Sequence, residues 1–125
     1  MLPLRFPWLW MALGWLLVAG VAAGELVPAR MISAIPVNDK LEHAGSYCLL
    51  MLWFAGMFDR RRHIPIAIIL AVLGFTLDAL QLTTATRDFD MRDVAANTVG
   101  ILIGLALSLT LLGGWCRRVE KYLPA

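Results

Sequence analysis

The chain has 125 residues, of which 60% are hydrophobic and 16% are charged, and its formal net charge is +2. Soluble domains average about 45–50% apolar and about 25% charged residues, so this composition excludes an ordinary soluble domain and indicates an integral membrane protein. The length allows a single domain, residues 1–125, and the charge is too small to suggest nucleic-acid binding.

Four hydrophobic segments follow one another along the chain. The first, residues 6–24, would extend about 28 Å as a helix, close to the hydrocarbon thickness of a bilayer. The others cover residues 41–58, 64–84 and 94–116. Because backbone groups in lipid must bond within their own segment, each is expected to be helical. We therefore predict an all-α integral membrane protein, a four-helix bundle with short links.

The first segment has a second interpretation as a cleaved signal peptide. Arg5 precedes the apolar run, and the small residues Val21-Ala22-Ala23 resemble a cleavage site. The run is long for a signal peptide and contains Trp8, Trp10 and Trp15. These features favour a helix that stays in the mature protein.

Basic residues predict the orientation in the membrane. They gather in the second link, at Arg60–Arg62, and after the last segment, at Arg117, Arg118 and Lys121. The excess of Lys and Arg on cytoplasmic loops then places both termini and the second link in the cytoplasm, with the first and third links outside. In this arrangement His63 is interpreted as a solvated residue of the cytoplasmic link.

The segment at residues 41–58 begins with polar residues. Asp39 precedes the helix like a capping residue, and Lys40, His43 and Tyr47 share one helical face at spacings of three and four. A cap, a lysine reaching toward the interface and an interfacial tyrosine explain most of this pattern without a function. His43 is less well explained, because it lies about one turn inside the segment.

The third and fourth segments carry polar stripes as well. Asp78 and Gln81 share a face of the third, and Asp93 and Asn97 share a face of the fourth with Gly100 and Gly104, whose G-x-x-x-G spacing permits close helix contact. Gly113 lies outside this stripe and is expected to tolerate a larger side chain. The alternative explanation for Asp78 and Gln81 is that they only form hydrogen bonds that hold helices together.

These stripes are expected to meet at the outward membrane face, under a link that carries Arg87. Ionisable residues within membrane segments are functional-site candidates by default, and arginine suits a phosphate or carboxylate. One histidine without a nearby thiolate does not predict a metal site, and no cofactor is expected. The predicted ligand-binding residues are Asp39, Lys40, His43, Tyr47, Asp78, Gln81, Arg87, Asp93 and Asn97.

The polar residues also form three ordered motifs between residues 39 and 104. They are Asp39-Lys40-x-x-His43-x-x-x-Tyr47, Asp78-x-x-Gln81 and Arg87-x5-Asp93-x3-Asn97-x2-Gly100. Together they resemble the VanZ-like family of small bacterial integral membrane proteins, named for a protein associated with low-level teicoplanin resistance. The family usually has Glu in place of Asp78. The resemblance implies the bacterial cytoplasmic (inner) membrane, the cell envelope and a link to glycopeptide antibiotic resistance.

Two functions of different classes are consistent with these residues, and a structural or assembly role is a third alternative. The first is recognition of an amphiphilic envelope molecule, such as a lipid-linked or lipidated glycan or peptide, in addition to contact with membrane lipids. The second is a membrane-embedded enzyme acting on a lipid-linked envelope substrate, with His43 and either Asp78 or Asp93 as catalytic groups. Binding is favoured, because the sequence contains no complete hydrolase signature.

Overall fold

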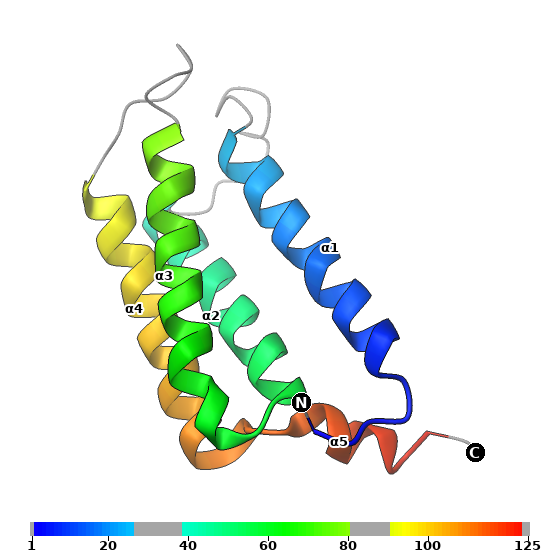
Figure 1. Ribbon diagram of the computed structural model, residues 1–125. Coiled ribbons are helices and arrows are strands. Elements are labelled where there is room, and N and C mark those ends of the chain that lie inside the picture. Colours follow the sequence, from blue (N-terminus) through cyan, green and yellow to red (C-terminus); the bar gives the residue numbers. More distant parts are fainter. Residues whose placement is uncertain (1, 27–38, 81–90, 124–125) are drawn as a thin grey trace.

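The computed structural model describes residues 2–26, 39–80 and 91–123, and every regular element in these ranges is helical (Figure 1). The long helices alternate in direction and are α1 (Pro7–Leu26), α2 (Asp39–Met57), α3 (His63–Leu80) and α4 (Met91–Leu107). Short elements lie at the bottom of Figure 1: the 3-10 turn η2 (Arg60–Arg62), the π-helical turn η4 (Ser108–Leu112) and α5 (Trp115–Glu120). We call this the lower end. The upper end is where α2 and α4 begin and α3 ends.

Three stretches of the described chain are long and apolar enough to cross a membrane: Pro7–Gly24, Arg60–Leu80 and Met91–Leu112. The remaining predicted span, residues 41–58, forms a helix of the right length, but α2 does not reach the same apolarity. Its first turns contain Glu42 and His43 among apolar neighbours. The all-helical prediction is confirmed for the described residues, and α2 is less apolar than the three candidate spans.

α2 differs because it is the central helix of the bundle. It contacts α1, α3, α4 and α5. Its side chains Tyr47, Leu50, Met51, Ala55 and Met57 have no exposed surface. The other long helices expose large apolar side chains, as lipid-facing helices do. A helix enclosed by protein can carry polar residues, because partners on its neighbours satisfy them.

The last predicted span, residues 94–116, ends at Leu112 in the structure, where η4 stops. Gly114 has a φ of 71°, a left-handed conformation that glycine adopts without a Cβ penalty, and the chain turns there into α5. The expected tolerance at Gly113 is wrong. A Cβ on Gly113 would overlap the Ser108 carbonyl oxygen and lie 3.0 Å from Cε1 of His63.

The predicted glycine stripe of α4 packs directly on α2. A Cβ added to Gly100 would lie 2.8 Å from the carbonyl carbon of Ala44. A Cβ added to Gly104 would lie 2.8 Å from Cβ of Met51 and 3.0 Å from the carbonyl oxygen of Cys48. Small residues at helix contacts let two backbones approach closely. We call this contact the α2–α4 seam.

We expect Gly100→Ala and Gly104→Ala to lower stability by about 1–3 kcal/mol each, the usual cost of overpacking a close contact. Gly45→Ala is the matched control, because a Cβ on Gly45 of α2 meets nothing within 4 Å. Thermal melting in detergent measures the difference. Equal melting temperatures for all three variants would show that the seam does not limit stability.

Tryptophans from distant parts of the chain pack together at the lower end. The ring centroids of Trp10 and Trp53 are 5.7 Å apart, and that of Trp115 lies 5.5 Å from the first and 5.2 Å from the second. The Trp53 indole donates to the Trp10 carbonyl at 3.1 Å, and the Trp115 indole to the Leu52 carbonyl at 2.6 Å. Each of these two partly buried donors therefore has an acceptor, as buried indole N–H groups usually do.

A carboxylate joins the first and last described segments beside these tryptophans. Glu120 accepts hydrogen bonds from the backbone N–H of Arg5 at 2.7 Å, the N–H of Phe6 at 3.0 Å and the Trp10 indole at 2.8 Å. The Arg5 guanidinium in turn donates to the carbonyl oxygens of Glu120 and Leu123. We call this group the Glu120 clasp.

The Glu120 clasp makes stability depend on pH. Burial by itself would raise the pKa of Glu120, but the hydrogen bonds from Arg5, Trp10 and Phe6 outweigh it, and the pKa lies below its ordinary value of 4.5. A carboxylate with a lowered pKa stabilises the fold above the unfolded-state value, and this contribution is lost as the pH falls below it. We expect the melting temperature to drop as the pH is lowered from about 5 to about 3.

Glu120→Gln should lower the melting temperature at neutral pH and flatten its fall with acid, because the titrating group is gone. Glu42→Gln serves as the control, since it removes the same charge from an exposed position of α2. If Glu120→Gln and the unaltered protein have the same profile between about pH 5 and about pH 3, the clasp does not couple folding to protons.

Candidate functional site

A chain of hydrogen bonds crosses the upper end of the bundle and takes one side chain from each of three helices. Nδ1 of His43 on α2 lies 3.0 Å from Oδ1 of Asn97 on α4. Nδ2 of Asn97 donates to Oδ2 of Asp78 on α3 at 3.1 Å. On the other side of the imidazole, Nε2 of His43 lies 4.0 Å from Oδ1 of Asp93. We call these four residues the upper-end network.

Helical periodicity brings these side chains together. Asp93, Asn97, Gly100 and Gly104 repeat at spacings of four, three and four, and all are buried on the face of α4 that meets the other helices. Gly74 leaves room on α3. A Cβ on Gly74 would lie 3.1 Å from Nδ2 of Asn97 and 3.2 Å from the Tyr47 ring. The predicted inward stripe on α4 is therefore present, and on α3 Asp78 is buried as well.

Asp78 is the deepest polar member of the upper-end network and has no exposed surface. A buried carboxylate is costly unless hydrogen bonds compensate the loss of water, so the contact with Asn97 is needed. The Asp78 side chain reaches the Asn97 amide and so links α3 to α4.

The network selects one tautomer of His43. The NH₂ group of Asn97 donates a hydrogen bond to Asp78, so the side-chain carbonyl oxygen of Asn97 faces His43, and this oxygen can only accept. Nδ1 of His43 must then carry the proton, and in the neutral ring Nε2 is left as an acceptor. At 4.0 Å, Asp93 is beyond hydrogen-bond distance of Nε2 but close enough to stabilise an imidazolium. His43 is thus prepared to take up a proton at Nε2.

The structure places some predicted site residues and leaves others open. Tyr47 has no exposed surface and packs beside Gly74, so it belongs to the core under the network and not to the membrane interface. Asp39 and Lys40 are the first residues of α2, and their side chains fall outside the described part of the chain. Gln81 and Arg87 also lie outside the described residues.

No group of three His, Cys, Asp or Glu side chains in the described ranges is placed to hold a metal ion. Within the network, an amide stands between His43 and Asp78, and the role of Asn97 as this bridge was not predicted. The stripe on α4 indicated that Asn97 points inward. Its partners depend on how α2 and α3 are rotated, which one stripe does not determine.

Asp78→Asn should release the His43 tautomer, because an amide at position 78 can donate as well as accept and Asn97 can then turn its NH₂ toward Nδ1. We expect imidazole ¹⁵N shifts to change from protonated Nδ1 to a mixture of tautomers. His63 is an internal reference, since its Nε2 lies 3.1 Å from the Ala55 carbonyl. Thr98→Val, which changes only a bond to the Val94 carbonyl, should leave His43 unchanged. A single Nδ1–H tautomer in Asp78→Asn would show that Asp78 does not set the His43 tautomer through Asn97.

Comparison with known proteins agrees with the resemblance seen in the motifs. The family model described as VanZ/LLP1 matches residues 9–112, which include α2, α3, α4 and the upper-end network. An uncharacterised protein of the fission yeast Schizosaccharomyces pombe is 33% identical over 91 residues, 70% of this chain and 54% of that protein. The chain spans about half the length of this curated relative. No solved structure matches the present chain. The chain belongs to the VanZ/LLP1 family.

Proposed function

We propose that the protein binds the polar head of an amphiphilic envelope molecule at the upper-end network. The observation that carries this proposal is the hydrogen-bonded row of His43, Asn97 and Asp78, buried among membrane helices. Burying three polar side chains at this depth is costly, and such groups in membrane segments mark functional sites by default. A ligand with a lipid tail would lie in the bilayer while its head reaches the network.

The head is expected to carry a hydrogen-bond donor or a negative charge. Neutral His43 offers Nε2 as an acceptor, and protonated His43 offers a donor, so the imidazole can serve either kind of group. Lys40 and Arg87, which belong to the same predicted site, supply positive charge for a phosphate or carboxylate. Their participation is part of the proposal.

The proposed topology puts this site on the outward membrane face. In it the chain crosses four times, with α2 as the enclosed span, and both termini lie in the cytoplasm. The basic residues on the cytoplasmic side of this topology outnumber those of the outward links, which supports this orientation. They are Arg5, Arg60–Arg62, Arg117, Arg118 and Lys121, against Arg30, Lys40, Arg87 and Arg92. A lipid-linked or lipidated glycan or peptide of the cell envelope would then be within reach from the outer leaflet.

A membrane enzyme is the second candidate, and one observation favours it. The hydrogen bonds that join Asp78, Asn97 and His43 fix a tautomer that leaves Nε2 of His43 basic. Asp93 lies 4.0 Å from this atom and would stabilise the imidazolium. An acid that orients a histidine in this way is a recurrent feature of general-base catalysis. In that case a hydroxyl or water of the substrate complex would give its proton to Nε2.

Resistance to glycopeptides would follow only if the amphiphile were a cell-wall precursor. The presence of a relative in a fission yeast favours a ligand class that is not confined to the bacterial wall. We therefore place the lipid-anchored polar head, and not a particular antibiotic, at the centre of the proposal.

The test is mass spectrometry of amphiphiles that copurify with the protein in mild detergent. We expect one species to be enriched over the total membrane extract, and His43→Gln and Asp78→Asn to reduce its amount about tenfold or more, as the loss of a hydrogen bond to a charged group does. Thr98→Val is the control on α4, since its hydroxyl bonds only to its own helix.

Incubation of the purified protein with the enriched species separates the two candidates. An unchanged mass supports binding, whereas a shifted mass that requires His43 supports the enzyme. Identical extracts from the unaltered protein and folded Asp78→Asn would remove the upper-end network from ligand recognition and leave it as a structural link.

A further inference from the structure

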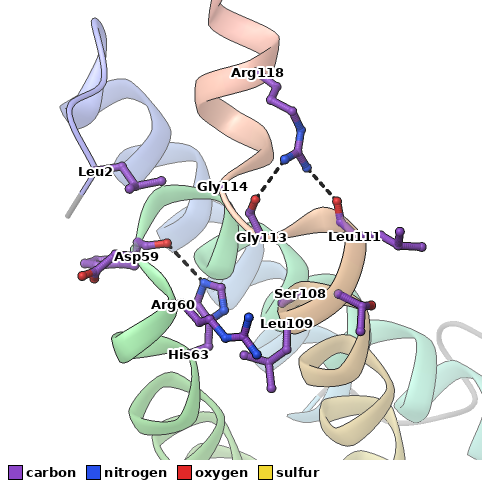
Figure 2. A pocket seen from close by; sticks show the side chains of 12 residues that line it. Leu2, Asp59, Arg60, His63, Ser108, Leu109, Leu111, Gly113, Gly114 and Arg118 are labelled. Atoms are coloured by element: carbon purple, nitrogen blue, oxygen red, sulfur yellow. Dashed lines mark hydrogen bonds between the residues drawn. The ribbon is translucent and has the colours of Figure 1, made fainter.

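A pocket lies at the lower end, away from the upper-end network. It lies between η2 and η4 and has a volume of about 320 Å³, within the usual range of small-molecule sites (Figure 2). Its lining includes Arg60, His63, Ser108, Leu109, Gly113 and Arg118. Turns of π-helix such as η4 occur frequently at functional sites.

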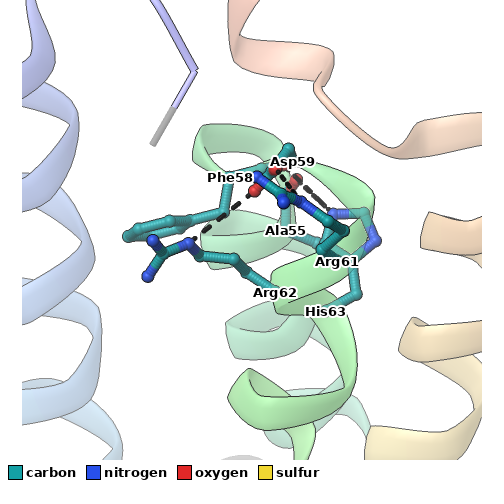
Figure 3. A network of polar contacts seen from close by, with 6 residues as sticks. All are labelled: Ala55, Phe58, Asp59, Arg61, Arg62 and His63. Atoms are coloured by element: carbon teal, nitrogen blue, oxygen red, sulfur yellow. Dashed lines mark hydrogen bonds and ion pairs between the residues drawn. The ribbon is translucent and has the colours of Figure 1, made fainter.

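His63 gives this pocket a buried hydrogen-bonding atom. The ring is only 2% exposed, so the expectation of a solvated link residue is wrong. Nε2 lies 3.1 Å from the Ala55 carbonyl oxygen and 3.2 Å from that of Phe58, and because carbonyls only accept, Nε2 carries the proton (Figure 3). Nδ1 of the neutral ring is then an acceptor, buried without a partner among the described residues.

Asp59 also lines the pocket, and its carboxylate is paired with two arginines that are not part of the lining. Asp59 lies 3.1 Å from Nε of Arg61 and 3.8 Å from Nε of Arg62 (Figure 3). The hydrogen bond from Arg61 is the main cause that holds the pKa of Asp59 below its ordinary value of 3.8. Asp59 therefore stays ionised and paired, and it does not need Arg60.

The pocket keeps two positive charges. Arg118 donates to the carbonyl oxygens of Gly113 at 3.2 Å and Leu111 at 3.0 Å, so it holds the end of η4 while keeping its charge at the rim. Arg60 extends across the pocket toward Leu109 (Figure 2) and pairs with no acid in the described part of the chain. Its guanidinium is available to a bound anion.

We propose that this pocket binds a glycerophosphate headgroup of an anionic lipid. Arg60 pairs with the phosphate, Arg118 adds positive potential, and a headgroup hydroxyl donates to Nδ1 of His63. The pocket lies where the apolar stretches Arg60–Leu80 and Met91–Leu112 both end, which is the depth of lipid headgroups. Basic pockets between membrane helices at such a boundary are typical sites for anionic headgroups.

The test is native mass spectrometry of the full chain in detergent, titrated with phosphatidylglycerol. We expect Arg60→Gln to weaken binding about tenfold or more, as loss of a hydrogen bond to a charged group does. Arg117→Gln is the matched control, because it removes the same charge at the same end from a residue that does not line the pocket. It should change the affinity less than about threefold, as a screened surface charge does.

A second ligand tests the role of His63 without altering a residue that the fold uses. Phosphatidylmethanol has the same phosphodiester charge but no headgroup hydroxyl. We expect it to bind about threefold to tenfold more weakly than phosphatidylglycerol, the usual value of one neutral hydrogen bond. Equal affinity would overturn the role of Nδ1.

Three results would overturn the headgroup proposal itself. Equal weakening by Arg60→Gln and Arg117→Gln would mean general attraction to a basic surface. Displacement of phosphatidylglycerol by millimolar inorganic phosphate would mean a site for free anions. The pocket shares no residue with the upper-end network, so a failure of Arg60→Gln to weaken binding would overturn the headgroup proposal and leave the function proposed for the upper end untouched.

Discussion

The structure depends on pairing the polar side chains that the central helix buries. α2 lies at the centre of the bundle, and its buried polar group, His43, bonds to Asn97 on α4. In lipid, an unsatisfied polar group costs several kcal/mol, so the helices around α2 must supply partners at the right depth. This requirement sets the rotation of α4, and through Asp78 it sets that of α3.

Much of this arrangement could be predicted from the sequence. The long apolar runs predicted the helices, and the spacing of Asp93, Asn97, Gly100 and Gly104 predicted the inward face of α4. These are local regularities, since helical periodicity places residues three and four apart on one side. The Gly stripe also predicted a close helix contact, although not that α2 would be the partner.

Other features could not be predicted, because they depend on contacts between distant residues. His63 follows three arginines and has the sequence context of an exposed link. It is buried because the Ala55 and Phe58 carbonyls accept from it at the end of α2. The Glu120 clasp joins residues more than 100 positions apart and has no local pattern. Tyr47 is likewise placed in the core by the absence of a side chain at Gly74.

The α2–α4 seam has a mechanical consequence. α2 contributes His43 above the seam and the carbonyls that orient His63 below it, while α4 contributes Asn97 above and leads into η4 below. At Gly100 the backbone of α4 meets the backbone of Ala44 with no side chain between them, and Gly104 lies against the Cys48 carbonyl and the Met51 side chain. The two helices therefore form a stiff pair that holds parts of both ends in fixed register. Alternating-access transport needs one half of a protein to rock against the other around its site. A pair locked in this way suits a fixed receptor for lipid-anchored groups better than a carrier.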